Sequence, residues 1–199
     1  MKQEIKSELT RQLIIDKAFV LFYKNGFHPT SVDKVMIETK LTKGAFYHHF
    51  KNKKELGVAV ISDRIQKRVF ESMIIPLSEE KDPILILKEV FSTRIQSFTT
   101  AEKQSGCPVN NLINEISERE IAYQLALRKI IDDWKKALID LLERGKKMDC
   151  IHKEVHSPSV AIFLISAFEG VRGIRKLYTD DSILDNYLIS LENYINQLR

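Results

Sequence analysis

The sequence predicts an all-α protein with a three-helix head at its N-terminus and a larger helical domain behind it. Apolar residues recur at helical spacing almost throughout the 199 residues. Only seven Gly and five Pro are present, too few for many strands joined by tight turns. A hydrophobic content of 44% allows a sizeable core. About nine helices and no strand are expected.

Three short amphipathic segments are expected in the first fifty residues. The first, around residues 14–22, ends at the turn KNGF. The second starts at Thr30, with Asp33 three residues later as a capping-box variant. The third is KGAFYHHF, capped by Thr42. Because a turn of only a few residues joins the second and third segments, they have the arrangement of a helix-turn-helix.

Longer helices are expected in the rest of the chain. One runs from Asn52 to Ile75 and is interrupted by Pro76 and the stretch SEEKDP. Others are expected over residues 84–98, just after Pro108, and over residues 118–147, 159–178 and 181–199. We therefore expect a helix-turn-helix domain of residues 1–54 and a larger helical domain of residues 55–199.

Positive charge is concentrated in the first quarter of the chain. Residues 1–56 carry eleven Lys or Arg and six Asp or Glu, whereas residues 57–199 carry 20 and 21. A basic head on a near-neutral body is typical of a protein that binds a polyanion. For the lysine cluster alone, a solvated basic face is the alternative.

The segment LTKGAFYHHFKNKKEL carries most of the predicted DNA contacts. Phe46 and Phe50 are four residues apart and would face inward. The opposite side of the helix start would then face solvent, and a recognition helix presents such N-terminal residues to base edges. Hydroxyls, histidine and lysine around it would hold phosphates. The predicted DNA-binding residues are Thr30, Thr42, Lys43, Gly44, Ala45, Tyr47, His48, His49 and Lys53.

Residues 26–56, GFHPTSVDKVMIETKLTKGAFYHHFKNKKEL, resemble the N-terminal pattern of the TetR family of one-component bacterial repressors. The match covers Gly26 to Leu56 and includes Gly44, Tyr47, His49, Phe50, Lys53 and Leu56. The turn departs from the pattern, because Thr39-Lys40-Leu41 replaces the usual Ala-Gly-Val, and Gly relieves strain at a left-handed position. The resemblance implies an all-α fold in which residues 55–199 form an effector-binding and dimerisation domain.

The last two helices are the predicted dimer interface. A helix-turn-helix protein usually binds as a symmetric pair to half-sites about 34–36 Å apart, so a homodimer on a palindromic double-stranded operator is expected. Both helices are apolar on more than one face and would form a four-helix bundle across the two-fold axis; an intramolecular hairpin is the alternative. The predicted interface residues are Phe163, Ala167, Val171, Leu184, Leu188, Leu191 and Ile195.

A small-molecule effector is expected in the larger domain, because ligand pockets are mostly apolar with a few polar groups. The predicted ligand or sensor residues are Phe91, Phe98, Cys107, Asn111, Tyr123, Trp134, Phe168 and Lys176, with Glu115 as a further polar point. For most of them, an ordinary place in the core is the alternative.

Cys107 is the candidate for reactive sensing. It precedes Pro108, which suits the first position of a helix, and a helix N-terminus lowers the pKa of a thiol. Lys176 would add a positive charge nearby. The surrounding GCPVNNLINE resembles a segment of a TetR subgroup that includes regulators of responses to reactive compounds. A small buried hydrophobe is the alternative for this cysteine.

Enzymatic, metal and membrane functions are not expected. The sequence has no Gly-rich phosphate loop, nucleophile elbow or HExxH motif, and Cys150, His152 and His156 match no common zinc spacing. No cofactor is expected. No apolar run approaches about 18 residues, the length needed to cross a membrane. Two widely separated cysteines are typical of a protein in a reducing compartment. The sequence predicts a cytoplasmic, dimeric, ligand-responsive repressor; a nonspecific architectural DNA-binding protein is the alternative.

Overall fold

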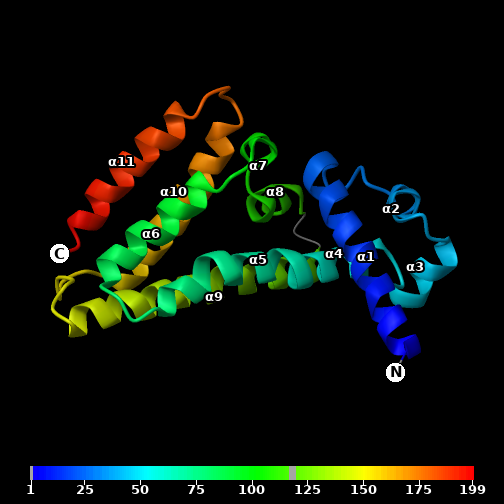
Figure 1. The fold of residues 1–199 in the computed structure, drawn as a ribbon, viewed down its shortest axis with the longest axis horizontal. Helices are drawn as coiled ribbons and strands as arrows, with labels where there is room; N and C mark the ends of the chain where they lie inside the picture. Colours follow the sequence, from blue (N-terminus) through cyan, green and yellow to red (C-terminus); the bar gives the residue numbers. More distant parts are fainter. Residues whose placement is uncertain (1, 117–119) are drawn as a thin grey trace. The chain divides into compact units, whose positions relative to one another are not determined.

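The computed structural model describes residues 2–116 and 120–199, and all regular elements among them are helices (Figure 1). This confirms the all-α prediction. The α-helices are α1 (Lys2–Asn25), α2 (Val32–Thr39), α3 (Lys43–His49), α4 (Lys53–Val60), α5 (Lys67–Val69), α6 (Pro83–Gln96), α7 (Thr100–Ser105), α8 (Pro108–Glu115), α9 (Ile121–Lys147), α10 (Ser157–Arg175) and α11 (Ser182–Asn196).

The chain divides into two compact units. The head unit comprises Met1–Lys67 and Asn111–Arg128, and the body unit comprises Arg68–Asn110 and Lys129–Arg199. This division differs from the predicted boundary after residue 54. Residues 55–67 continue a helix that starts in the head, and residues 111–128 return to the head from a distant part of the sequence, which no local pattern indicates.

Helical backbone continues without a break from Lys53 to Ser78. Two π-helical segments, Ile61–Gln66 and Phe70–Ile74, flank the short α5, and a 3₁₀ turn, Ile75–Ser78, ends the run. The residues at each junction keep right-handed helical torsions, so the helix changes its hydrogen-bond spacing without stopping. We call residues 53–78 the linking helix.

In the head unit, α1 packs against α2, α3 and α4. Ile14, Ile15 and Ala18 of α1 are fully buried. Phe22 meets the edge of Phe27 with ring centroids 4.9 Å apart. The apolar face of α1 therefore forms the base on which the two shorter helices rest.

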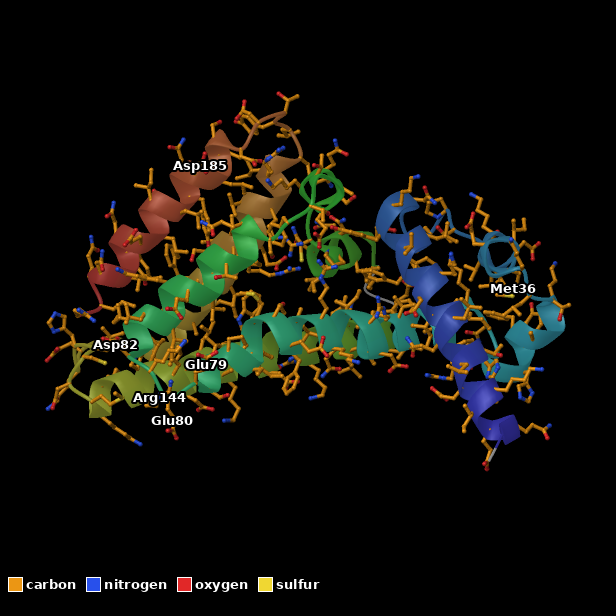
Figure 2. The ribbon with its side chains drawn as sticks, in the orientation of Figure 1. Met36, Glu79, Glu80, Asp82, Arg144 and Asp185 are labelled. Carbon is orange, nitrogen blue, oxygen red and sulfur yellow. The ribbon has the colours of Figure 1, made fainter. Side chains whose placement is uncertain are left out.

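In the body unit, α11 packs against α6 and α10, and all three contribute to one apolar core (Figure 1). Helix α10 is long and apolar enough to cross a membrane, but this is weak evidence, because the core helix of a soluble protein passes the same test. Arg144 of α9 donates to the carbonyl oxygens of Leu77 and Glu79 at 3.3 and 2.7 Å, and lies near Glu79 in Figure 2. This arginine fixes the end of the linking helix.

Helix α7 was not expected from the sequence, although its start carries a complete capping box. The Thr99 hydroxyl accepts from the Glu102 amide at 3.2 Å, and the Glu102 carboxylate accepts from the Thr99 amide at 2.9 Å. Such reciprocal bonds satisfy two of the free N–H groups at a helix start. The apolar periodicity is weak here, which is why the sequence predicts no helix between residues 98 and 108.

Candidate nucleic-acid interface

Helices α2 and α3 and the turn between them form the predicted helix-turn-helix. The structure places the N-cap of α2 at Ser31, whose side chain accepts from the Lys34 amide, and not at Thr30 as expected. Thr42 caps α3, as predicted, by accepting from the Ala45 amide at 3.3 Å. Lys40 ends α2 with φ of 57°, so a lysine occupies the left-handed position where the family pattern has glycine.

Helix α3 has a buried side and an exposed side. Phe46 is fully buried and Phe50 is 2% exposed. Lys43, Tyr47 and His48 are exposed on the other side, Tyr47 by 60%, while Ala45 is half-buried. Gly44 is exposed, and a Cβ added there would meet only the Thr42 hydroxyl, at 3.6 Å. The exposed side therefore presents a lysine, a phenol and an imidazole on a helix anchored by two phenylalanines.

Lys43 forms an ion pair with Asp33 of α2, with Nζ and Oδ1 2.8 Å apart. A hydrogen bond from this carboxylate, together with its charge, raises the pKa of Lys43. Both side chains are largely exposed, so the pair is accessible to solvent and would be weak. When nucleic acid binds, a base edge or phosphate would therefore replace the Asp33 carboxylate as the partner of the Lys43 ammonium group.

Two predicted phosphate contacts are engaged inside the head unit. Thr30 is completely buried, and its hydroxyl donates to the Gly26 carbonyl at 2.8 Å, so it does not belong to an exposed interface. The Lys53 ammonium donates to the His28 carbonyl at 3.0 Å and lies 4.4 Å from the centroid of the Phe27 ring. Burial lowers the pKa of Lys53.

His49 lies half-buried at the end of α3, with its ring 4.8 Å from that of His48. Burial, followed by the nearby His48 and Arg11, lowers the pKa of His49 below the usual 6.5. The imidazole of His49 is therefore neutral at pH 7 in the DNA-free protein. It can contact a phosphate as an N–H donor.

Two residues that the sequence suggested for an effector site instead support the head. Glu115 accepts from the Phe27 amide at 2.6 Å and from the His28 amide at 3.3 Å. The hydroxyl of Tyr123 donates to the Lys54 carbonyl at 3.0 Å. Both contacts join segments more than 60 residues apart, so spacing along the chain could not reveal them.

Four of the predicted effector residues gather in the body unit. The ring of Phe168 lies 5.6, 6.1 and 5.7 Å from the rings of Phe91, Phe98 and Trp134, respectively. All four are buried, and the indole N–H of Trp134 has no hydrogen-bond partner. We call Phe91, Phe98, Trp134 and Phe168 the aromatic set. Asn111 and Tyr123 belong to the head unit, and Lys176 is exposed.

The surroundings of Cys107 favour the buried alternative over an activated thiol. The thiol does precede α8, but it is 2% exposed, and burial raises its pKa to about 12. Glu169 raises this pKa further, while Arg172 lowers it. Desolvation of the charged thiolate outweighs the favourable field of the helix start. The cation beside Cys107 is Arg172, and no contact places Lys176 there.

Most of the predicted dimer residues lie in the core of their own unit. Val171, Leu184, Leu191 and Ile195 are at most 6% exposed, while Ala167 and Leu188 are half-buried. Phe163 is 49% exposed, and its ring lies 4.5 Å from that of Tyr194. The exposed apolar residues of these two helices and the turn between them are Ile162, Phe163, Ile174, Leu177, Tyr178 and Ile189.

No group of three or more His, Cys, Asp or Glu side chains is placed to hold a metal ion within residues 2–116 and 120–199.

Residues 14–60 match the family model of bacterial regulatory proteins of the tetR family, and residues 84–191 match the tetracyclin repressor-like C-terminal domain. A helix-turn-helix transcriptional regulator from the lacX 3′ region of Lactococcus lactis is 30% identical over 67% of this chain and 68% of its own length. The repressor DhaR of Mycobacterium sp. is 24% identical over 89% and 88%.

Solved structures of regulators have the same fold. A TetR-family regulator from Cytophaga hutchinsonii superposes with a TM-score of 0.87 at 24% identity, over 98% of this chain and 96% of its own. The two matched models cover the helix-turn-helix and most of the body unit. The chain belongs to the TetR family of bacterial transcriptional regulators.

Proposed function

We propose that this TetR-family regulator is a cytoplasmic, dimeric repressor that occupies a palindromic operator and leaves it when a small molecule binds the body unit. The observation that carries the proposal is α3, a helix capped by Thr42 and anchored by two buried phenylalanines, with Lys43, Tyr47 and His48 directed outward. A recognition helix presents such N-terminal residues to base edges in the major groove.

The proposed contacts divide into two kinds. Lys43, Tyr47 and His48, with the small Gly44 and Ala45 beside them, would face base edges, because the small residues allow close approach. Thr42 and His49, together with the exposed Lys51 and Lys54, would contact phosphates. Lys53 would contribute only if its ammonium left the His28 carbonyl. We expect no catalysis, because the function rests on binding.

The proposed dimer uses the exposed side of α10 and α11. Three apolar side chains are exposed near Gly170: Phe163 by 49%, Ile174 by 48% and Leu177 by 85%. Phe163, Gly170 and Ile174 lie on one side of α10, and Leu177 follows the end of the helix. A Cβ added at Gly170 would meet no atom within 4 Å, so a second helix could approach closely there. Two copies of this surface would form a four-helix bundle.

The proposed inducer is a small molecule that binds without reacting. The aromatic set and the unpaired indole N–H of Trp134 offer apolar contact and one donor, the composition expected of a ligand site. A reactive inducer is less favoured, because Cys107 is protonated at neutral pH. The linking helix is the proposed path from body to head. Inducer and operator would disfavour each other reciprocally, typically by about 1–3 kcal/mol.

Competition binding tests the proposal. DNA from the region flanking the gene is titrated with the purified protein, alone and against bulk DNA, and we expect preference for one inverted repeat. Lys43→Ala should reduce that preference, whereas Lys51→Ala should weaken binding to all sequences alike and flatten its salt dependence. Equal affinity of the wild-type protein for all duplexes would instead support an architectural DNA-binding protein.

A further inference from the structure

A groove of about 330 Å³ runs along the body unit between the end of the linking helix and α6. One wall is formed by Ser72, Pro76 and Glu79, and the other by one face of α6 from Ile86 to Ser97. The volume is in the range of small-molecule sites. No member of the aromatic set lines the groove, although Arg94 in its wall lies against the ring of Phe98.

The lining of the groove is partly apolar and partly charged. Pro76, Ile86 and Val90 form its apolar part. Glu79 and Glu89 also line it, and the Lys81 ammonium bridges their carboxylates at 2.8 and 3.4 Å. From Ile86 to Arg94, eight residues of helix span about 12 Å. The groove therefore suits an elongated apolar body with one polar head.

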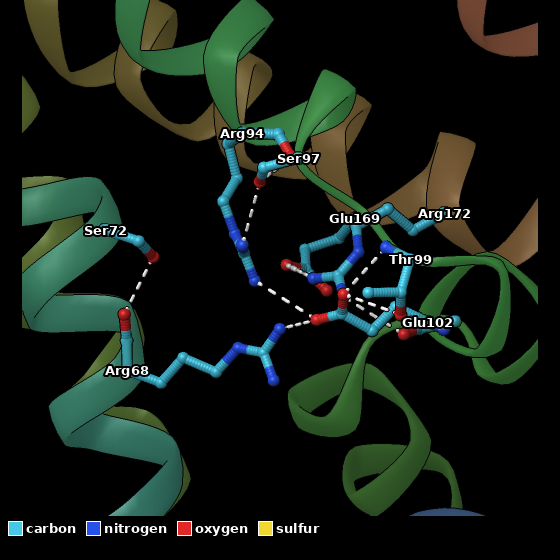
Figure 3. A network of polar contacts seen from close by, with 9 residues as sticks. Arg68, Ser72, Arg94, Ser97, Thr99, Glu102, Glu169 and Arg172 are labelled. Atoms are coloured by element: carbon cyan, nitrogen blue, oxygen red, sulfur yellow. Dashed lines mark hydrogen bonds and ion pairs between the residues drawn. The ribbon is translucent and has the colours of Figure 1, made fainter.

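Arg94 indicates that the polar head of a ligand in this groove is negatively charged. Its guanidinium lies 4.7 Å from the centroid of the Phe98 ring, which fixes its plane, and its side chain is 15% exposed. It donates to the Ser97 hydroxyl at 3.1 Å and lies 3.7 Å from the Glu102 carboxylate (Figure 3). A ligand carboxylate would replace the neutral Ser97 hydroxyl with a charged acceptor, which can accept two parallel bonds from a planar guanidinium.

Hydroxyl groups also belong to the lining. Ser72, Thr93 and Ser97 line the groove with Arg94. The Ser72 and Ser97 hydroxyls donate to the carbonyls of Arg68 and Arg94 at 2.7 and 2.9 Å, so each would have to rotate before donating to a carboxylate oxygen. Glu89 precedes Arg94 by five residues on α6, so the acidic pair would repel an anion from its side of the groove and favour the Arg94 side. We propose that this groove binds an amphipathic monocarboxylate, with its carboxylate at Arg94 and its apolar body over Pro76, Ile86 and Val90.

A ligand carboxylate at Arg94 would affect the contacts of Glu102. Glu102 accepts from Arg68 on the linking helix, lies near Arg94 and caps α7 through Thr99 (Figure 3). A carboxylate at Arg94 competes with Glu102 for the same guanidinium. Occupancy of the groove therefore weakens one of the contacts that tie α6 to α7 near the linking helix.

Calorimetric titration of the full-length, DNA-free protein tests the site. The probes are 4-phenylbutyrate, 4-phenylbutanol and 4-phenylbutylamine, which share one apolar body and differ in the head group. We expect 4-phenylbutyrate to bind at least about tenfold more tightly than the other two. Equal affinities, or tighter binding of the amine, would overturn the proposal, whether or not the protein binds an operator.

Two substitutions locate the site. Arg94→Gln should weaken 4-phenylbutyrate binding about tenfold or more, and Arg94→Lys less, because lysine keeps the charge but not the planar fork. Thr93→Trp, at an exposed position, should fill the groove and abolish binding even if Arg94→Gln fails to fold. Arg128→Gln and Thr100→Trp, at exposed positions outside the groove, are the matched controls. Unchanged affinity in Thr93→Trp would show that the probe binds elsewhere.

Discussion

Lys40 adopts a strained backbone conformation in the helix-turn-helix. It ends α2 in the left-handed region, with φ of 57°, and its amide donates to the Ile37 carbonyl at 3.2 Å. For a residue with a Cβ this conformation costs about 1–2 kcal/mol, whereas glycine adopts it freely. The turn therefore keeps the geometry of a glycine turn while carrying a lysine.

We expect Lys40→Gly to raise the free energy of unfolding by about 1 kcal/mol, since it removes this strain, partly offset by the greater freedom of glycine in the unfolded chain. Chemical denaturation of the two proteins measures the difference. Glu38→Gly, two residues earlier in regular helix, is the control and should instead destabilise by about 0.5–1 kcal/mol. Equal effects at both positions would contradict the account.

Cys107 and Cys150 differ in exposure, and their reaction rates should differ accordingly. Cys107 is 2% exposed with its pKa raised to about 12, whereas Cys150 is half-buried, and burial raises its pKa as well. Alkylation by iodoacetamide at pH 7.5, followed by mass spectrometry, should modify Cys150 first. In denaturant the two should react alike. Faster alkylation of Cys107 in the native protein would restore the reactive-sensor hypothesis.

At the scale of elements, α9 supports α4 through the fit of Tyr123 to Gly57. A Cβ added at Gly57 would lie 2.6 Å from the Tyr123 hydroxyl and 2.8 Å from the Phe27 ring. The same hydroxyl donates to the Lys54 carbonyl one turn earlier. Gly57 therefore stands in the interior of a helix because a tyrosine from a segment 66 positions away occupies the space of its side chain.

We expect Gly57→Ala to destabilise the protein by about 1–2 kcal/mol, because overpacking outweighs the better helix propensity of alanine. Thermal or chemical unfolding measures the effect. In Gly57→Ala/Tyr123→Ala the penalty should be smaller than the sum of the single effects, as for residues in contact. Gly173→Ala, with only an amide nitrogen at 3.9 Å, is the control and should be neutral or stabilising.

At the scale of the whole molecule, the repressor hypothesis requires two copies. The exposed side of α10 holds Phe163 and Ile174 on either side of Gly170, where no atom would contact an added Cβ, and the exposed Leu177 follows the helix. A large charged side chain at Gly170 would disturb no contact within one copy. It would, however, separate two helices that pack closely across a two-fold axis.

Gly170→Arg should therefore leave the chain folded and convert the dimer to a monomer. Sedimentation velocity measures the mass, and titration with a two-half-site duplex should show a large loss of affinity, since one head makes only half of the contacts. Gln104→Arg adds the same charge at an exposed position of α7 and should remain dimeric. A dimeric Gly170→Arg would place the interface on another surface.

The sequence by itself determined the features that depend on neighbouring residues. Apolar periodicity defined the longer helices, and Thr42 and Asn52 marked the starts of α3 and α4, because a cap bonds to an amide only two or three residues away. The exposed side of α3 followed from Phe46 and Phe50 at helical spacing.

Only the tertiary structure decided which environment each polar or aromatic side chain occupies. Thr30 is buried, Glu115 and Tyr123 bind the head, and Cys107 is desolvated. Leu184 and Ile195 face their own core and not a partner. These outcomes depend on contacts between segments far apart in the chain, and the free energy of a charge or a hydrogen bond is set by those surroundings.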